Sequence, residues 1–151
     1  MTVPEQMASL RRAIRRLITE RLGEQTGRPF MQLLALKAIS DGVRSQSAIA
    51  ERLFVDAPAV SRLVARLEED GLVSRGTSDD RRCVRLELSA AGRDELGLLD
   101  DALVWTDEEI LRHITGAEMA EFKRIMEKLQ TGLIQARGPL PVDGCGVAPE
   151  S

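Results

Sequence analysis

The sequence predicts a mainly α-helical protein with one small β-hairpin, and three observations support this. Apolar residues recur at three- and four-residue steps in six segments, which is the period of an amphipathic helix. Between the fourth and fifth segments, apolar and polar residues alternate strictly over 84–88, as they do in a half-buried strand. The preceding segment, 76–82, is rich in Gly, Ser and Asp, so we expect a hairpin with a charged tip.

The first two helices are predicted from apolar periodicity and from the residues that interrupt it. Apolar residues from Met7 to Leu22 form one face of the first helix, which ends in a break at 25–30. A second helix fits 31–41 and stops at Gly42. Glycine after the last periodic residue is a typical end of a helix.

The third and fourth helices are predicted from their capping residues. Ser45 can cap a short third helix, which ends in a turn at 54–55. Asp56 can cap the fourth helix, over 57–70, and Gly71 then follows as its C′ residue. Ser and Asp side chains accept hydrogen bonds from the first N–H groups of a helix, and glycine suits the left-handed position after its end.

A hairpin and two more helices complete the predicted order. Residues 72–75 suit a first strand, and Ser89 can cap the helix that follows the second. Thr115 and Glu118 form the capping-box pattern of a final helix. The segment 138–151 holds three Gly and three Pro, which is typical of a flexible tail. Helices followed directly by a hairpin predict a winged helix-turn-helix.

The composition argues against an enzyme or a metal protein. The sequence has one histidine, His113, and two cysteines, Cys83 and Cys145, that are far apart. A zinc site needs about four closely spaced ligands, and no CxxC, HExxH, GxGxxG or phosphate-binding glycine loop occurs. No serine lies in a nucleophile-elbow motif. We therefore expect no catalytic residues, no metal and no cofactor.

The sequence carries no signal for a membrane or for secretion. No apolar run approaches the roughly 18 residues of a membrane span, and the first ten residues lack a secretory pattern. We expect a cytoplasmic protein.

The net charge of −3 is unevenly distributed. The segment 94–151 has five basic and twelve acidic residues, whereas 57–93 has seven arginines and six acids. Of the 21 basic residues, 18 are arginine, the side chain best shaped for phosphates and guanine edges. The overall charge therefore does not exclude a nucleic-acid partner.

The chain resembles the MarR family of transcriptional regulators over residues of about 5–136. Gln46–Arg75 reads like that family's helix-turn-helix and first wing strand. Asp80–Gly92, DRRCVRLELSAAG, is similar to the family's wing signature, an acid and arginines followed by a strand and Ser-x-x-Gly. Thr115–Glu118 resembles the start of the family's last helix.

The resemblance implies a homodimer that binds a palindromic double-stranded DNA site, and a repressor by family habit. Four segments are expected. They are an N-terminal dimerisation helix (1–27), a winged helix-turn-helix (28–89), C-terminal dimerisation helices (90–137) and a flexible tail (138–151). The broad apolar faces of the terminal helices favour association independently.

DNA contacts are expected from two helices and the wing. The recognition helix, 57–70, is expected to lie in the major groove, where an arginine can bind guanine O6 and N7. Arg62 is the favoured reader, and Arg66 has the alternative of pairing with Glu69 or Asp70. The outward positions of this helix are Ala57, Pro58, Ala59, Ser61, Arg62 and Arg66. Ser45, Gln46 and Ser47 are expected to donate to phosphate or, alternatively, only to cap their helix.

The resemblance assigns a minor-groove contact to the wing, 76–83. Arg82 would enter the groove, Arg81 would hold a phosphate, and Asp80 would orient a neighbouring arginine. A solubilising hairpin tip is the alternative.

The family also binds small aromatic or anionic effectors, and the candidate contacts here are Arg16, Phe30, Met31 and His113, with ordinary core or surface roles as the alternative.

Two other functions remain open from the sequence. Winged helices also serve as protein-interaction or dimerisation modules, although the intact wing tip favours DNA. A redox-sensing regulator is the other alternative, in which Cys83, beside Arg82 and Arg85, has a lowered pKa and Cys145 is its partner.

Overall fold

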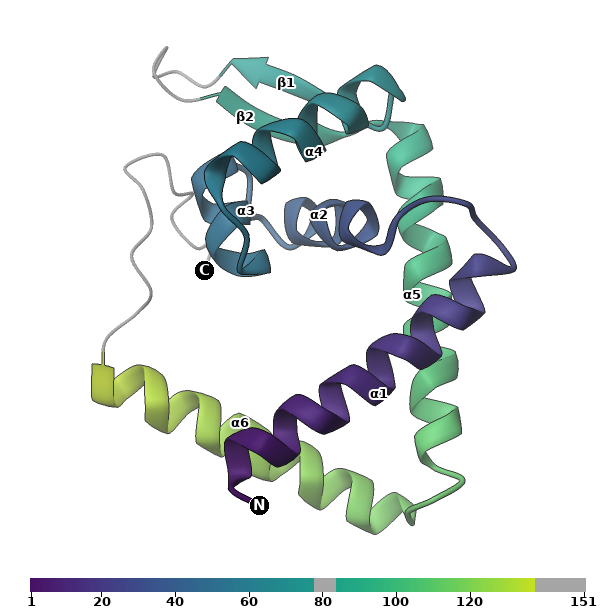
Figure 1. Ribbon diagram of the computed structural model, residues 1–151, viewed down its shortest axis with the longest axis vertical. Helices are drawn as coiled ribbons and strands as arrows, with labels where there is room; N and C mark the ends of the chain where they lie inside the picture. The colour runs from purple at the N-terminus through teal and green to yellow at the C-terminus, as the bar shows by residue number, and fades with distance from the viewer. Residues whose placement is uncertain (78–83, 138–151) are drawn as a thin grey trace. The chain divides into compact units, whose positions relative to one another are not determined.

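Six α-helices and one antiparallel hairpin make up the part of the chain that the computed structural model describes, residues 1–77 and 84–137 (Figure 1). Their order confirms the predicted fold class. The elements are α1 (Val3–Gly23), α2 (Phe30–Ser40), α3 (Gln46–Leu53), α4 (Ala57–Glu69), β1 (Val73–Thr77), β2 (Val84–Leu88), α5 (Ala90–Ile110) and α6 (Gly116–Arg137).

The chain divides into two compact units, which we describe separately. Thr19–Asp100 forms one, and we call its described residues the winged unit. Met1–Ile18 and the chain from Asp101 to the end of α6 form the other, which we call the end-helix unit. Both boundaries fall inside long helices, α1 and α5, and not after residues 27 and 89, where the segments predicted from the sequence meet.

The winged unit has a closed hydrophobic core. Its helix α2 packs against α3, α4 and β2, and α3 packs against α4 (Figure 1). Every one of these elements contributes side chains with essentially no solvent exposure. The largest are Leu33, Leu36, Ile49, Val60, Val64, Leu67, Leu86 and Leu99. Burial of a side chain of this size typically stabilises a fold by about 1.5–3 kcal/mol.

The predicted caps of α3 and α4 are confirmed. Ser45 Oγ accepts a hydrogen bond from the Ala48 N–H at 3.2 Å, and Asp56 Oδ1 accepts one from the Ala59 N–H at 2.8 Å. Gly71 follows α4 with a φ of +72°, which is the left-handed C′ position predicted for it. These local signals fix where the helix-turn-helix begins and ends.

The hairpin differs in one respect from the prediction. We expected a strand over 72–75 and a turn from Gly76, but β1 continues to Thr77, with Gly76 opposite Arg85 and Thr77 opposite Val84. Pairing with β2 overrides the turn preference of these residues, because an extended strand satisfies their backbone groups. The N–H of Leu86 also donates to the Arg44 carbonyl at 3.0 Å, so β2 is tied to the loop between α2 and α3.

The Ser-x-x-Gly pattern after β2 has a direct structural explanation. Ser89 Oγ accepts from the Gly92 N–H at 3.0 Å and donates to the Gly71 carbonyl at 2.6 Å. A Cβ on Gly92 would lie 2.1 Å from the carbonyl oxygen of Leu72. Ser89 therefore caps α5 as predicted, and Gly92 lets α5 lie directly against the chain entering β1.

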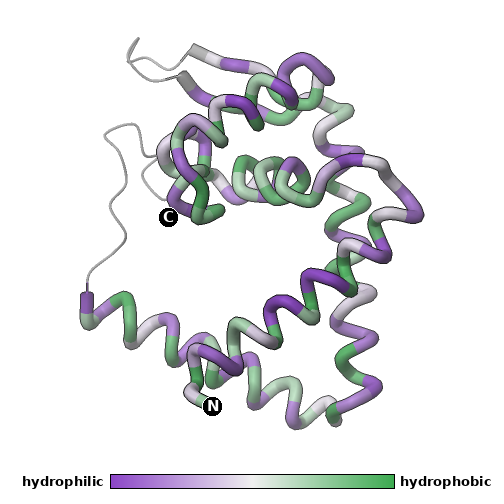
Figure 2. The backbone as a smooth tube through the Cα atoms, in the orientation of Figure 1, coloured by the Kyte–Doolittle hydropathy of each residue, from purple (hydrophilic) through white to green (hydrophobic). Residues whose placement is uncertain are grey.

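The end-helix unit contains α6, whose capping box is confirmed. The Thr115 N–H donates to Glu118 Oε2 at 2.8 Å, and the Glu118 N–H donates to Thr115 Oγ1 at 3.2 Å. Beyond Met119, however, α6 buries very little. Figure 2 shows hydrophobic residues recurring along it. Those that are exposed are Phe122, Ile125, Leu129, Leu133 and Ile134.

No helix in the described ranges combines the length and the apolar character that a membrane crossing requires.

Candidate nucleic-acid interface

The helix α4 has one buried face and one exposed face. Val60, Val64 and Leu67 are fully buried, whereas Ser61 and Arg62 are exposed. The predicted outward positions are confirmed with one refinement. Ala57, Pro58, Ser61, Arg62 and Arg66 are exposed, and Ala59 is half-buried. The buried face anchors the helix on the core, so the other face is presented to solvent in a fixed orientation.

A side-chain hydrogen bond links α3 to α4 on the exposed surface. Ser61 Oγ donates to Gln46 Oε1 at 3.1 Å, so the structure brings together two of the predicted DNA-contact residues. Ser47 is exposed beside them. Ser45 is buried, and its side chain caps α3. Of the three serine and glutamine candidates at the start of α3, Gln46 and Ser47 are therefore better placed to meet a ligand.

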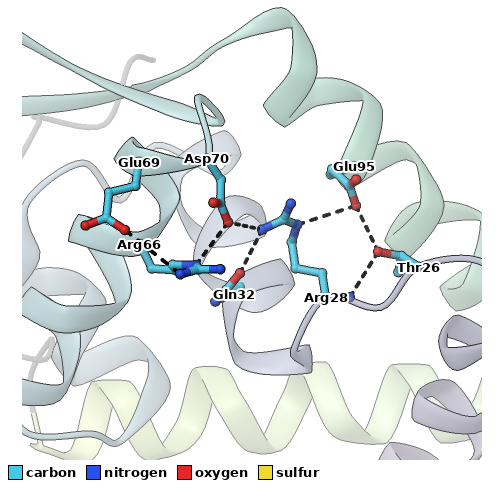
Figure 3. Close-up of polar contacts among 7 residues, drawn as sticks. All are labelled: Thr26, Arg28, Gln32, Arg66, Glu69, Asp70 and Glu95. Atoms are coloured by element: carbon cyan, nitrogen blue, oxygen red, sulfur yellow. Dashed lines mark hydrogen bonds and ion pairs between the residues drawn. The ribbon is translucent and has the colours of Figure 1, made fainter.

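The two arginines of α4 differ sharply although they lie one turn apart. Arg62 has no ion pair with any residue of the described ranges. Arg66 Nε lies 3.3 Å from Asp70 Oδ2, and its Nη1 lies 4.0 Å from Glu69 Oε2 (Figure 3). The alternative that the sequence left open for Arg66, pairing with Glu69 or Asp70, is thus present in the structure. Arg62 is the arginine that is available for a ligand.

Asp70 belongs to a larger cluster centred on Arg28, which joins four parts of the winged unit (Figure 3). Arg28 Nη1 donates to Asp70 Oδ2 at 2.7 Å and to Gln32 Oε1 at 3.0 Å. Arg28 Nε lies 3.8 Å from Glu95 Oε2, and Glu95 also accepts from Thr26 Oγ1 at 3.2 Å. The cluster therefore connects the end of α4 to the α1–α2 loop, α2 and α5.

The cluster is partly buried, which strengthens its electrostatic interactions. The Arg28 side chain is 20% exposed, and its Nε is buried without a hydrogen-bond acceptor among the described residues. The hydrogen bond from Arg28 lowers the pKa of the Asp70 carboxyl, against a smaller raising effect of burial, and the charge of Arg66 lowers it further. Sequence reasoning missed Arg28, because its partner Asp70 is 42 residues away and no local spacing signals the contact.

The remaining candidate residues lie outside the described residues or are divided between the two units. Asp80, Arg81 and Arg82 lie outside the described residues, as do Cys83 and Cys145. The effector candidates fall in different units. Arg16 and His113 belong to the end-helix unit, whereas Phe30 and Met31 are half-buried in the winged unit. Their role as a ligand site stays a prediction.

The part of the chain that the structure describes holds no group of three or more His, Cys, Asp or Glu side chains arranged for a metal ion. What the winged unit offers a partner is the exposed face of α4 and the start of α3. This surface carries hydrogen-bond donors and the guanidinium of Arg62, which has no ion pair within residues 1–77 and 84–137, and such groups suit recognition of phosphates and base edges.

Comparison with known proteins finds one family model that is similar to part of the chain. A sequence model described as the MarR family matches residues 26–82, the segment from Thr26 through α4 to the wing. Over this segment the chain is similar to the MarR family. The helices and hairpin of the described residues have the winged-helix fold of MarR structures.

Solved structures share the MarR fold over most of the chain. Wild-type MarR from Escherichia coli, without ligand, has a TM-score of 0.75 and 20% identity, and the match covers 85% of this chain and 97% of that one. A Mycobacterium tuberculosis MarR-family protein in complex with p-aminosalicylic acid has a TM-score of 0.73 and 22% identity, covering 86% and 99%. A probable transcriptional regulator from Pseudomonas aeruginosa has a TM-score of 0.67 and 22% identity, covering 85% and 96%.

Proposed function

We propose that this protein is a ligand-responsive transcriptional repressor that binds a palindromic operator in double-stranded DNA as a homodimer. It acts in the cytoplasm and is not an enzyme. In this proposal α4 enters the major groove and the wing, 76–83, reaches the minor groove. The observation that carries it is the exposed face of α4, on which Ser61 and Arg62 lie opposite a fully buried face. Among the described residues Arg62 has no ion-pair partner.

The proposed base contacts lie in the first half of α4. Arg62 is the guanine reader, and a bidentate contact of this kind is worth about 1–3 kcal/mol of discrimination. Ala57, Pro58 and Ala59 form an apolar edge for contact with thymine methyl groups, and Ser61 donates to a base or phosphate. The hydrogen bond between Ser61 and Gln46 supports this arrangement, because it orients both side chains before DNA arrives.

The proposed backbone contacts surround these residues. Gln46 and Ser47, with Ser45 as the cap behind them, donate to phosphates from the start of α3. Arg66 leaves its ion pair with Asp70 and contacts a phosphate instead. Asp70 then still has Arg28 as a partner. In the wing, Arg82 enters the minor groove, Arg81 holds a phosphate and Asp80 orients an arginine, as the family resemblance implies.

The uncovered face of α6 supports the homodimer. Five large apolar side chains of this helix are at least 39% exposed, and contiguous exposed apolar surfaces of this kind mark interaction sites. A twofold dimer would place two copies of α4 in successive major grooves, roughly one helical turn apart. A protein-interaction module with no DNA ligand would use the same face but would not need Arg62.

An effector site is part of the proposal. The M. tuberculosis relative was solved with p-aminosalicylic acid, an aromatic acid, which is the class of effector predicted for Arg16, Phe30, Met31 and His113. We expect p-aminosalicylate, used as a probe, to weaken DNA binding, and Arg16→Ala to reduce this response.

The test of the proposed function is selection of duplexes from a random-sequence library on the wild-type protein. The expected product is an inverted repeat with half-sites about 10–10.5 base pairs apart, bound with an affinity that falls steeply with salt. Arg82→Ala should abolish tight binding while the dimer persists in sedimentation. Enrichment of no sequence, with binding insensitive to salt, would overturn the DNA function and favour the interaction module.

A further inference from the structure

The turn between α3 and α4 carries an exposed phenylalanine in an unusual backbone conformation. Phe54 has φ 54° and ψ 46°, and it is the one non-glycine residue with positive φ in the described ranges. Its N–H donates to the Glu51 carbonyl at 3.3 Å, and the N–H of Val55 donates to the Ala50 carbonyl at 3.1 Å. These two bonds form the Schellman motif, in which Phe54 occupies the C′ position that normally favours glycine.

The Phe54 side chain is not stabilised by packing against the rest of the fold. Its side chain is 88% exposed, the same exposure as the N-terminal Met1. Aromatic side chains are scarce in this chain, which has three Phe, one Trp and no Tyr, and Phe30 and Trp105 are both partly buried. Glycine would adopt the left-handed conformation at lower energetic cost, so neither backbone nor packing explains this residue. A residue kept in an unfavourable conformation is a reason to look for a functional contact.

The position of Phe54 indicates what that contact is. It precedes Asp56, the N-cap of α4, by two residues, so its Cα lies within about 7 Å of the start of that helix. The first turn of α4 exposes the apolar side chains of Ala57 and Pro58, and Phe54 is an exposed apolar residue three positions before Ala57. Apolar side chains at the start of a recognition helix contact the methyl groups of thymine, and a phenyl ring also packs on deoxyribose.

We propose that Phe54 is a DNA-binding residue that makes an apolar contact with the DNA beside the first turn of α4. This inference rests on the proposed DNA-binding function and deepens it. The contacted group is a thymine methyl or a deoxyribose, which share the apolar chemistry that a phenyl ring recognises.

The experiment compares Phe54→Gly, Phe54→Leu and Arg62→Ala with the wild type, by fluorescence anisotropy on the tightest duplex selected from a random library. Phe54→Gly should weaken binding by roughly tenfold, the size expected for losing one buried apolar side chain. Its melting temperature should not fall, because glycine relieves the backbone. Phe54→Leu, which keeps apolar bulk, should retain most of the affinity.

A second set of duplexes identifies the contacted group. Replacing thymine by uracil removes only the C5 methyl. If wild-type affinity falls on a uracil duplex while Phe54→Gly is unaffected by the same change, the contact is a thymine methyl. If Phe54→Gly is weaker than the wild type by the same factor on thymine and uracil duplexes, the contact is deoxyribose.

The outcomes separate this inference from the proposed function. If the wild type binds, Arg62→Ala weakens binding and Phe54→Gly binds as the wild type does, the role of Phe54 is overturned and the DNA function stands. A fall in the melting temperature of Phe54→Gly that accounts for its lost binding would also overturn it, in favour of a structural role. If the wild type selects no duplex, the DNA function fails, and the inference fails with it.

Discussion

The winged unit and α6 have the same amphipathic pattern in the sequence but very different surroundings in the structure. In the winged unit, side chains such as Leu36, Ile49 and Val64 have no exposure, because helices and hairpin close over them. In α6, Leu129 is 45% exposed and Leu133 is 66% exposed. The winged unit therefore buries its own hydrophobic side chains, whereas α6 leaves an apolar face exposed to solvent. In the proposed homodimer, a second copy of the chain covers this apolar face of α6.

The largest expected effect is on the stability of the winged unit, whose hydrophobic core is closed. Gly92→Ala should destabilise the winged unit by about 3 kcal/mol, a large value for overpacking. The added Cβ would lie 2.1 Å from the Leu72 carbonyl oxygen, and neither atom can rotate away, because the backbone fixes the position of both. The free energy of unfolding in urea measures this change.

The matched control is Gly97→Ala in the same helix. A Cβ on Gly97 has no atom within 4 Å, so the substitution should raise the unfolding free energy by about 0.5–1 kcal/mol through helix propensity alone. Opposite signs for the two substitutions would confirm that α5 is held tightly at Gly92. Equal effects would show that the contact with Leu72 is not tight in solution.

The next largest expected effect concerns dimerisation through the exposed apolar face of α6. Leu129→Glu should convert the proposed dimer to monomers, raising the dimer dissociation constant by more than about 100-fold, because an interface cannot bury two new unpaired carboxylates without a large penalty. Analytical ultracentrifugation measures it, and the folded monomer should keep its helical circular dichroism.

The control on α6 is Thr131→Glu, two residues along and about 200° around the helix. It adds the same charge outside the apolar face and should leave association unchanged. If Leu129→Glu sedimented as the wild type does, the apolar face of α6 would not be the dimer surface.

The smallest expected effect concerns the cluster that joins the end of α4 to the rest of the winged unit. Because Arg28 and Arg66 lower the pKa of Asp70, its carboxylate stabilises the fold above its unfolded pKa of about 3.9. This contribution should be lost as the pH falls through the lower, folded value. The difference in unfolding free energy between wild type and Asp70→Asn should therefore shrink below about pH 4. A difference that stays constant from pH 7 to pH 3 would contradict the cluster.

Most of the fold could be predicted from the sequence because its signals are local. The caps at Ser45, Asp56 and Ser89 and the capping box at Thr115 each depend on residues within three positions. The end of β1 could not be predicted, since cross-strand pairing decides it. Gly92 was recognised as part of a pattern, but its cause is a contact with Leu72, a residue 20 positions earlier.

The candidate site was predictable in part for the same reason. Helical period alone gives the outward position of Arg62 and offers Arg66 the partner Asp70, four residues on. It cannot reveal that Arg28 also binds Asp70, nor that Phe54 adopts a left-handed conformation and remains exposed. Those facts depend on how distant segments pack and on how one turn closes.

The most direct test of the central claim, that the first half of α4 reads DNA, compares Arg62→Ala with Arg66→Ala on the selected duplex and on duplexes with single base changes. Arg62→Ala should weaken binding by roughly 1–3 kcal/mol and abolish discrimination at one base pair in each half-site. Arg66→Ala should weaken binding less and uniformly, with a shallower salt dependence. If Arg62→Ala bound as tightly as the wild type and discriminated every base pair as before, α4 would not be the reading helix.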